Sequence, residues 1–144
     1  MVCVSLLAAS QVFASQDMAG VADSNRARVN YMLNCQGCHG PDGAGTADGA
    51  VPTLQQFVGK FLRVPGGREF LVRVPGSANA ALSNADLAEV LNWMLHTISP
   101  SELPGAFQPY TETEVGPLRK EPMADVLQVR EGLVRLIEAA KQRR

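Results

Sequence analysis

The sequence carries Cys35-Gln36-Gly37-Cys38-His39, and this stretch decides how the rest of the chain is interpreted. Two cysteines only two residues apart are poorly placed to link distant parts of a fold. Three interpretations of such a pair compete: a redox-active disulfide, half of a zinc site, and covalent attachment of a haem. The residues around the pair distinguish among these three.

The surroundings of the motif favour haem attachment. A thioredoxin-like motif needs no histidine after its second cysteine, and it follows a strand in an alternating βα pattern that this chain lacks. A zinc site needs about four ligands, but His96 is the one other histidine, and Cys3 lies in a segment that we expect to be removed. The spacing allows both sulfurs to form thioether bonds to one haem. We therefore expect Cys35 and Cys38 to hold one haem c, with His39 as a ligand of its iron.

The first 14 residues look like an export signal. They read MVCVSLLAASQVFA, which is apolar, uncharged and too short to span a bilayer. Val12 and Ala14 suit signal peptidase, which prefers small or compact residues at the first and third sites before the cut. The usual basic residues at the front are missing, and the alternative is a buried N-terminal strand or helix. We expect a signal peptide over 1–14, a periplasmic protein and no membrane span in the mature chain.

The stretch 27–93, about half of the chain, resembles a class I monohaem cytochrome c. Members of that family have an aromatic residue four positions before the first cysteine and a glycine-rich loop after the motif. A Pro-x-Leu element follows, and a final helix carries an aromatic residue that crosses the first helix. The matching features here are Tyr31, the loop 40–45, Pro52-Thr53-Leu54 and Trp93. The resemblance implies a small all-α domain around one covalent haem.

The resemblance also implies roles for single residues. Tyr31 and Trp93 are expected to pack where two helices cross, and Leu54 to contact the haem. The Pro52 carbonyl is expected to accept a hydrogen bond from Nδ1 of His39 and so fix its tautomer, although Pro52 could simply end a turn. Haem propionates commonly pair with arginines. One or two of four basic residues are therefore expected near them, or else these form a solvated face: Lys60, Arg63, Arg68 and Arg73.

Apolar spacing and capping residues predict the order of the helices. The expected helices cover 22–35, with Ser24 as N-cap, then 54–64, 67–74, and 83–98 with Ser83 as N-cap. We assign 15–100 to the cytochrome domain and 101–144 to a C-terminal extension. In the extension, 101–120 is rich in proline and glycine and is expected to be extended. An amphipathic helix is expected from Pro122 onwards, packed on the core rather than on a partner.

The residue expected on the second face of the iron is missing. Electron-transfer members of the family use a methionine from the loop before the last helix, but the corresponding place here, 73–76, reads Arg-Val-Pro-Gly. Met18 and Met32 flank the motif in poor geometry. A vacant or weakly held sixth position is one alternative, and the substitutes that the sequence offers are Met123, Met94, His96, Asn79 and Tyr110.

Composition narrows the function further. The 144 residues carry a net charge of −1, which argues against a nucleic-acid partner because phosphate binding needs a basic face. No catalytic dyad is apparent, so we expect an electron carrier rather than an enzyme. Its partners would be a donor dehydrogenase and an acceptor oxidase or cytochrome. One alternative is a gas-binding or peroxide-reactive haem protein. Another is a fixed cytochrome subunit of a dehydrogenase complex, docked through 101–144.

Overall fold

The computed structural model describes residues 18–121 and 123–143, and these residues form helices and no strand. The expectation of an all-α fold is thus confirmed for this part of the chain. The expected signal peptide over 1–14 lies outside the described residues. Within 18–121 and 123–143, no helix combines the length and apolar character that a bilayer crossing would require.

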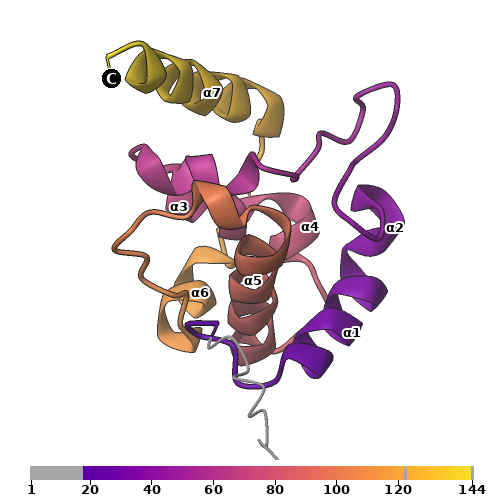
Figure 1. Ribbon diagram of the computed structural model, residues 1–144. Helices are drawn as coiled ribbons and strands as arrows, with labels where there is room; N and C mark the ends of the chain where they lie inside the picture. Colours follow the sequence, from indigo (N-terminus) through magenta and orange to yellow (C-terminus); the bar gives the residue numbers. More distant parts are fainter. Residues whose placement is uncertain (1–17, 122, 144) are drawn as a thin grey trace, which may run out of the picture.

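The fold is organised around the packing of α1 (Ser24–Asn34) against α5 (Asn84–Ile98), as Figure 1 shows. The N-cap of α5 is Ser83, as expected, and its hydroxyl accepts from the Asp86 N–H at 3.0 Å. The N-cap of α1 is not the expected Ser24 but Asp23. The Asp23 carboxylate reaches two free N–H groups at the helix start, which stabilises this end of α1.

The segment expected to be helical over 54–64 is helical only in part. It forms a 3-10 helix, η1 (Val58–Arg63). The first residues are drawn away from a helix, because the Leu54 N–H bonds to the Gly43 carbonyl and Gln56 has a left-handed φ of 49° with its N–H on Ile98. The following helix was predicted correctly to within one residue, as α3 (Gly67–Arg73), and a single turn, α4 (Pro75–Ala78), comes next.

The expectation that 101–120 is extended is wrong. This stretch contains a 3-10 turn, η2 (Pro100–Glu102), and a helix, α6 (Glu112–Leu118), despite Pro117 within the helix. Proline and glycine lower helix propensity, but tertiary packing overrides it here, because α6 packs against α5 with Val115 fully buried. The last helix, α7 (Val126–Gln142), starts four residues later than expected, with Asp125 as its N-cap.

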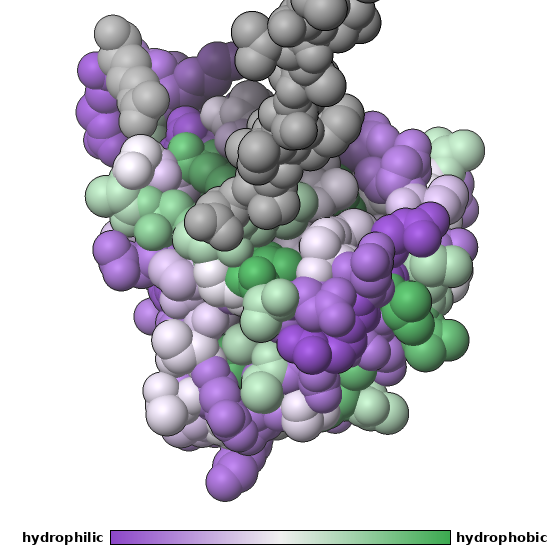
Figure 2. Space-filling view, turned by 60° about the horizontal axis from the view of Figure 1, so that its bottom comes forward, coloured by the Kyte–Doolittle hydropathy of each residue, from purple (hydrophilic) through white to green (hydrophobic). Residues whose placement is uncertain are grey.

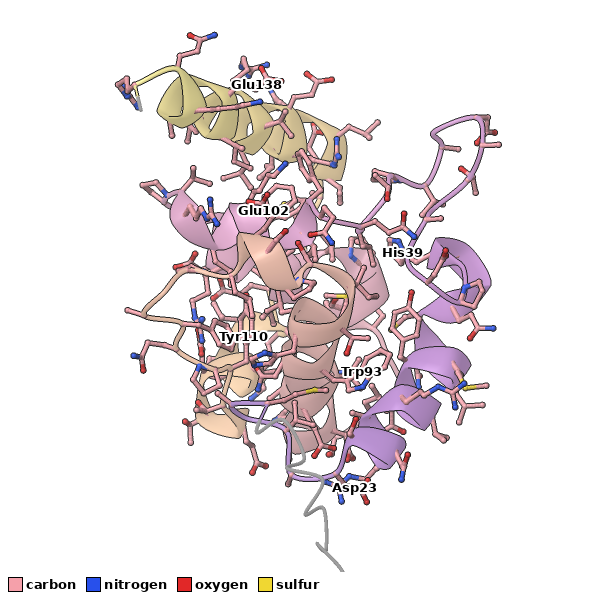
Figure 3. The ribbon with its side chains drawn as sticks, viewed as in Figure 1. Asp23, His39, Trp93, Glu102, Tyr110 and Glu138 are labelled. Atoms are coloured by element: carbon pink, nitrogen blue, oxygen red, sulfur yellow. The ribbon has the colours of Figure 1, made fainter. Side chains whose placement is uncertain are left out.

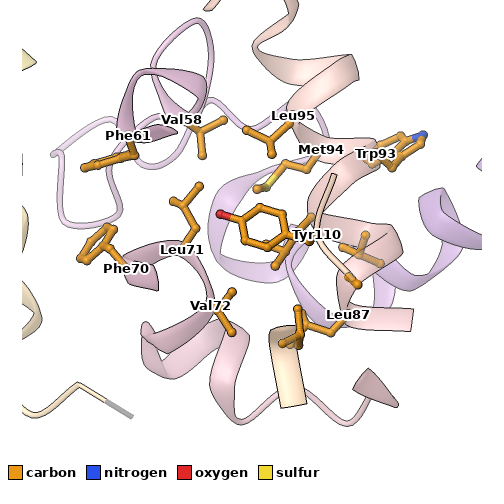
Figure 4. Packing of buried hydrophobic residues seen from close by; sticks show 14 of the residues in the cluster. Val58, Phe61, Phe70, Leu71, Val72, Leu87, Trp93, Met94, Leu95 and Tyr110 are labelled. Atoms are coloured by element: carbon orange, nitrogen blue, oxygen red, sulfur yellow. The ribbon is translucent and has the colours of Figure 1, made fainter. Parts of the chain in front are cut away.

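The C-terminal extension supplies part of the hydrophobic core. Tyr110, Val115 and Leu133 are buried with residues of α3 and α5, and Figure 4 shows Tyr110 in the middle of this cluster. The buried Asn92 side chain on α5 joins three segments. It donates to the carbonyls of Gly20 and Tyr110, both at 3.0 Å, and accepts from the Tyr110 N–H at 2.8 Å. The extension is therefore joined to α5 and, through Asn92, to the segment that leads into α1 and the motif.

Candidate functional site

The motif occupies one helical turn directly after α1. Cys35 ends α1, and the N–H groups of Cys38 and His39 both donate to the Cys35 carbonyl, at 3.2 and 3.0 Å. The turn that follows is α2 (Gln36–His39). Residues three and four apart share one side of a helix, so the two thiols and the imidazole belong to the same side of this turn. Both cysteines carry free thiols, with Cys35 half-buried and Cys38 exposed.

Burial sets the protonation states of the motif. It raises the pKa of the Cys35 thiol to about 11, with a smaller contribution from Cys38. Burial lowers the pKa of His39, and the Pro52 carbonyl opposes this change by raising it. The imidazole is thus neutral at pH 7, which is the form that binds a metal.

The nitrogen Nδ1 of His39 is buried and has no hydrogen-bond partner with normal geometry. Figure 3 shows His39 on the side of α2 that faces the rest of the molecule. An unpaired buried nitrogen costs free energy unless another group satisfies it. With Nδ1 directed to the Pro52 carbonyl, the other ring nitrogen, Nε2, is left for a metal. Such an imidazole beside two free thiols fits a site completed by a haem, with thioethers at the cysteines and imidazole on the iron. The predicted bond from Nδ1 to the Pro52 carbonyl stays a prediction.

The loop after the motif brings Pro52 to His39. The Gly45 N–H donates to the His39 carbonyl at 2.9 Å, and the Thr46 N–H donates to the Val51 carbonyl at 2.9 Å. Gly45 has a φ of +76°, and a Cβ there would lie 2.2 Å from the Val51 oxygen. Only glycine allows the backbone at 45 to come this close to the Val51 carbonyl on the other side of the loop.

Tyr31 and Trp93 meet where α1 and α5 pack together. Their ring centroids are 5.4 Å apart with the planes tilted by 46°, and both side chains are buried. The Tyr31 hydroxyl donates to the Gly40 carbonyl at 2.8 Å, immediately after the motif. This pair therefore fixes the helix crossing and the end of α2 together, while Leu54 packs at the edge of the same core.

The two tyrosines of the chain should titrate at unusually high pH. Burial raises the pKa of Tyr31 to about 12, and burial also raises the pKa of Tyr110 strongly. A folded-state pKa above the unfolded value of about 10 stabilises the fold below pH 10, and this contribution is lost as the pH rises through about 12. Ultraviolet difference titration should therefore show no tyrosinate near pH 10 in the native protein, but two in guanidinium. A native tyrosinate step at pH 10 would contradict this.

The basic residues expected near propionates already have protein partners. Arg63 lies 3.3 Å from the Glu102 carboxylate, which Lys60 also approaches, and the Arg73 Nε donates to the Glu121 carbonyl at 2.8 Å. Arg68 pairs with the Glu114 carboxylate and stacks on the Tyr110 ring. A role toward propionates stays a prediction. It requires each side chain to bind a propionate in addition to, or in place of, its present protein partner.

The candidate sixth ligands lie in different surroundings. Met94 is buried in the core, and His96 stacks edge-on against Phe107 with its Nε2 buried and unpaired. Asn79 is exposed at the end of α4. Met123 is half-buried, and its N–H donates to the Arg73 carbonyl at 3.1 Å. The Tyr110 hydroxyl donates to the Arg68 carbonyl at 2.8 Å, and its raised pKa disfavours the anionic form that would bind iron.

Sequence reasoning missed Glu89, which orients the helix leading into the motif. Its Oε1 accepts from the N–H groups of Ala22 and Asp23, both at 2.9 Å, and both of its oxygens accept from Arg26 at 2.8 Å. The sequence does give one indication of this role, an acidic residue within the apolar run of α5. A buried carboxylate needs hydrogen-bond donors or a positive charge nearby.

Comparison with known proteins agrees with this geometry. The cytochrome c family model matches residues 24–97, about half of the chain. A cytochrome c-552 from one strain of Thermus thermophilus is 29% identical over 120 residues, covering 71% of this chain and 80% of that protein. Another cytochrome c-552 of Thermus thermophilus is 31% identical over 109 residues, covering 63% and 82%. No solved structure matches significantly. The chain therefore belongs to the cytochrome c family, the haem proteins of electron transfer, and its cofactor is covalent haem c with its iron.

Proposed function

We propose that this cytochrome carries single electrons through one haem held by Cys35 and Cys38, with His39 as an iron ligand. Its donor would be a periplasmic dehydrogenase and its acceptor a terminal oxidase or another cytochrome. The observation that carries the proposal is the single helical turn that presents two free thiols and a neutral imidazole on one side. The proposal includes export through a signal peptide over 1–14.

Once bound, haem supplies the one-electron chemistry of its iron. The chain's own residues hold and orient it. The loop closed at Gly45 places the Pro52 carbonyl near His39, and the neutral imidazole offers a lone pair. The buried pair Tyr31 and Trp93 keeps water away from the start of the motif and fixes α1 on α5.

The surface of α1 supports a redox protein as partner. Val29, Met32 and Leu33 are 49%, 43% and 77% exposed, and Cys38 is exposed one turn further on. In Figure 2, a few hydrophobic residues lie at the right of the molecule among hydrophilic ones, on the side where α1 lies in Figure 1. Exposed apolar groups of this kind suit brief contacts, and redox complexes bury small areas.

A gas-binding or peroxide-reactive haem protein is the second candidate. The observation that favours it is the loop between α3 and α5, which contains no methionine. The proposal of a fixed subunit in a dehydrogenase complex has less support. The extension uses Val115 and Leu133 for this chain's own core, although Leu127 and Leu136 on α7 remain exposed.

The two candidates are separated by absorption spectra of the protein produced in a host that attaches haem. We expect a c-type spectrum that persists after acid-acetone extraction. A carrier with a strong sixth ligand should show a low-spin ferric spectrum and a reduced spectrum that CO leaves unchanged. A high-spin ferric spectrum with a CO-shifted reduced band would contradict the carrier and support gas binding. Colourless protein would contradict both.

A further inference from the structure

One arginine of the C-terminal extension, Arg119, binds the loop between α3 and α5, residues 74–83. The Arg119 guanidinium donates to the carbonyls of Ala78, Ala80 and Leu82, at 3.1, 2.6 and 2.7 Å. It also lies 3.3 Å from the Asn84 side-chain oxygen at the start of α5. A planar guanidinium offers several donors in a fixed arrangement, so it can bind alternate carbonyls of one loop at once.

The second part of the loop has few other hydrogen bonds to hold it. The first part is turned by local backbone hydrogen bonds, from Ser77 and Ala78 to Val74, from Asn79 to Pro75 and from Ala80 to Ser77. In the second part no N–H of 81–83 donates to the described backbone, and Ala81 is exposed. Segments with few buried apolar contacts and exposed backbone open at low free energy. Arg119 therefore supplies the hydrogen bonds that fix the second part of the loop, at the carbonyls of Ala80 and Leu82.

The extension is placed to bring Arg119 to the loop. Arg119 caps the end of α6, and α6 approaches the start of α5 closely at Gly116, where a Cβ would lie 2.9 Å from the Asn84 amide nitrogen. At the other end of the loop, the Arg73 side chain donates to the Glu121 carbonyl, and the Arg73 carbonyl accepts from the Met123 N–H. Both ends of the loop are thus fastened by residues of the extension, Arg119 at one end and Glu121 and Met123 at the other.

We propose that Arg119 is a positioning residue that fixes this loop over the sixth-ligand side of the haem iron and limits the access of small ligands. The inference rests on the proposed function. In the view of Figure 1, α4, the first turn of this loop, lies between α3 and α2, the helix that carries His39. Whether the loop supplies a ligand or covers a vacant position, small molecules reach the iron from this side only when the loop opens.

The test compares holoprotein variants Arg119→Ala and Arg119→Lys with wild type. The matched control is Arg135→Ala, which removes an arginine of the same extension that makes one exposed ion pair with Glu131. Hydrogen exchange followed by mass spectrometry should show faster exchange in 78–84 for Arg119→Ala. The rate of CO binding to the reduced protein should rise at least about fivefold, or CO binding should appear if the wild type shows none, since the accessible population grows as the loop loosens. Arg119→Lys should fall between, and Arg135→Ala should match wild type.

Two results would overturn the inference. One is unchanged exchange in 78–84 for Arg119→Ala, which would show that the arginine does not hold the loop. The other is faster exchange with CO binding, ferric spectrum and midpoint potential all as in wild type, which would reduce Arg119 to a structural contact. Haem content of the wild type is measured first. If the wild type lacks covalent haem, the proposed function itself fails, which is a distinguishable outcome.

Discussion

Replacing both Cys35 and Cys38 with alanine should remove all covalently bound haem from the protein. The two thiols lie on one side of one helical turn, and the described part of the chain has no other cysteine to take their place. A haem-stained denaturing gel of protein from a host that attaches haem should show the wild-type band and no band for the double variant. Each single variant should retain at most one thioether and a pyridine haemochrome band shifted to longer wavelength.

The control for this experiment is Cys3→Ala. This cysteine lies in the segment 1–14 that we propose to be removed on export, so the variant should stain as strongly as wild type. Equal staining of the double variant and wild type would show that haem is attached elsewhere. It would contradict the assignment of the motif as the attachment site.

Glu89→Gln should cause the second large effect, a loss of stability. The buried Glu89 carboxylate accepts two backbone N–H groups before α1 and both ends of the Arg26 guanidinium. An amide of the same shape turns one acceptor into a donor that faces Arg26. Glu89 is buried but Arg26 is half exposed and stays hydrated, so the cost comes from losing the charged acceptor of these hydrogen bonds. We expect a loss of about 2 kcal/mol in the free energy of unfolding.

Guanidinium denaturation of the oxidised holoprotein, followed by circular dichroism, measures this loss. The matched control is Glu131→Gln, which removes an exposed ion pair with Arg135 on α7 and should change the free energy of unfolding by less than about 0.5 kcal/mol. Equal effects of the two substitutions would mean that Glu89 does not anchor α1. A changed spectrum in Glu89→Gln would further show that this anchor reaches the motif.

The parts of the fold that sequence predicted were those set by local patterns. The first helix ends at Asn34, one residue before its predicted end at 35, and Ser83 with Asp86 marks the start of α5. Tyr31 and Trp93 were expected at a helix crossing and lie there. Spacing and capping are visible in a short stretch of sequence, so such features need no knowledge of the rest of the chain.

The parts that sequence did not predict depend on residues far apart in the chain. Gln56 leaves the helical conformation because its N–H bonds to Ile98, and α6 forms because Val115 is buried against α5. Arg119 was not singled out, since a basic residue in a loop gives no sign that carbonyls 35 or more residues earlier lie around it. The sixth-ligand candidates remained open for the same reason.

The hydrogen bonds of Asn92 have a consequence for the folding of the chain. The hydrogen bond to Gly20 joins residues 72 positions apart, and those to Tyr110 join residues 18 apart on the other side. Contacts between such distant positions slow folding, because a long stretch must be closed before they form. Residues near 110 must fold back onto α5 before the interior is complete, and the CxxCH turn should be reachable by attachment enzymes during that interval.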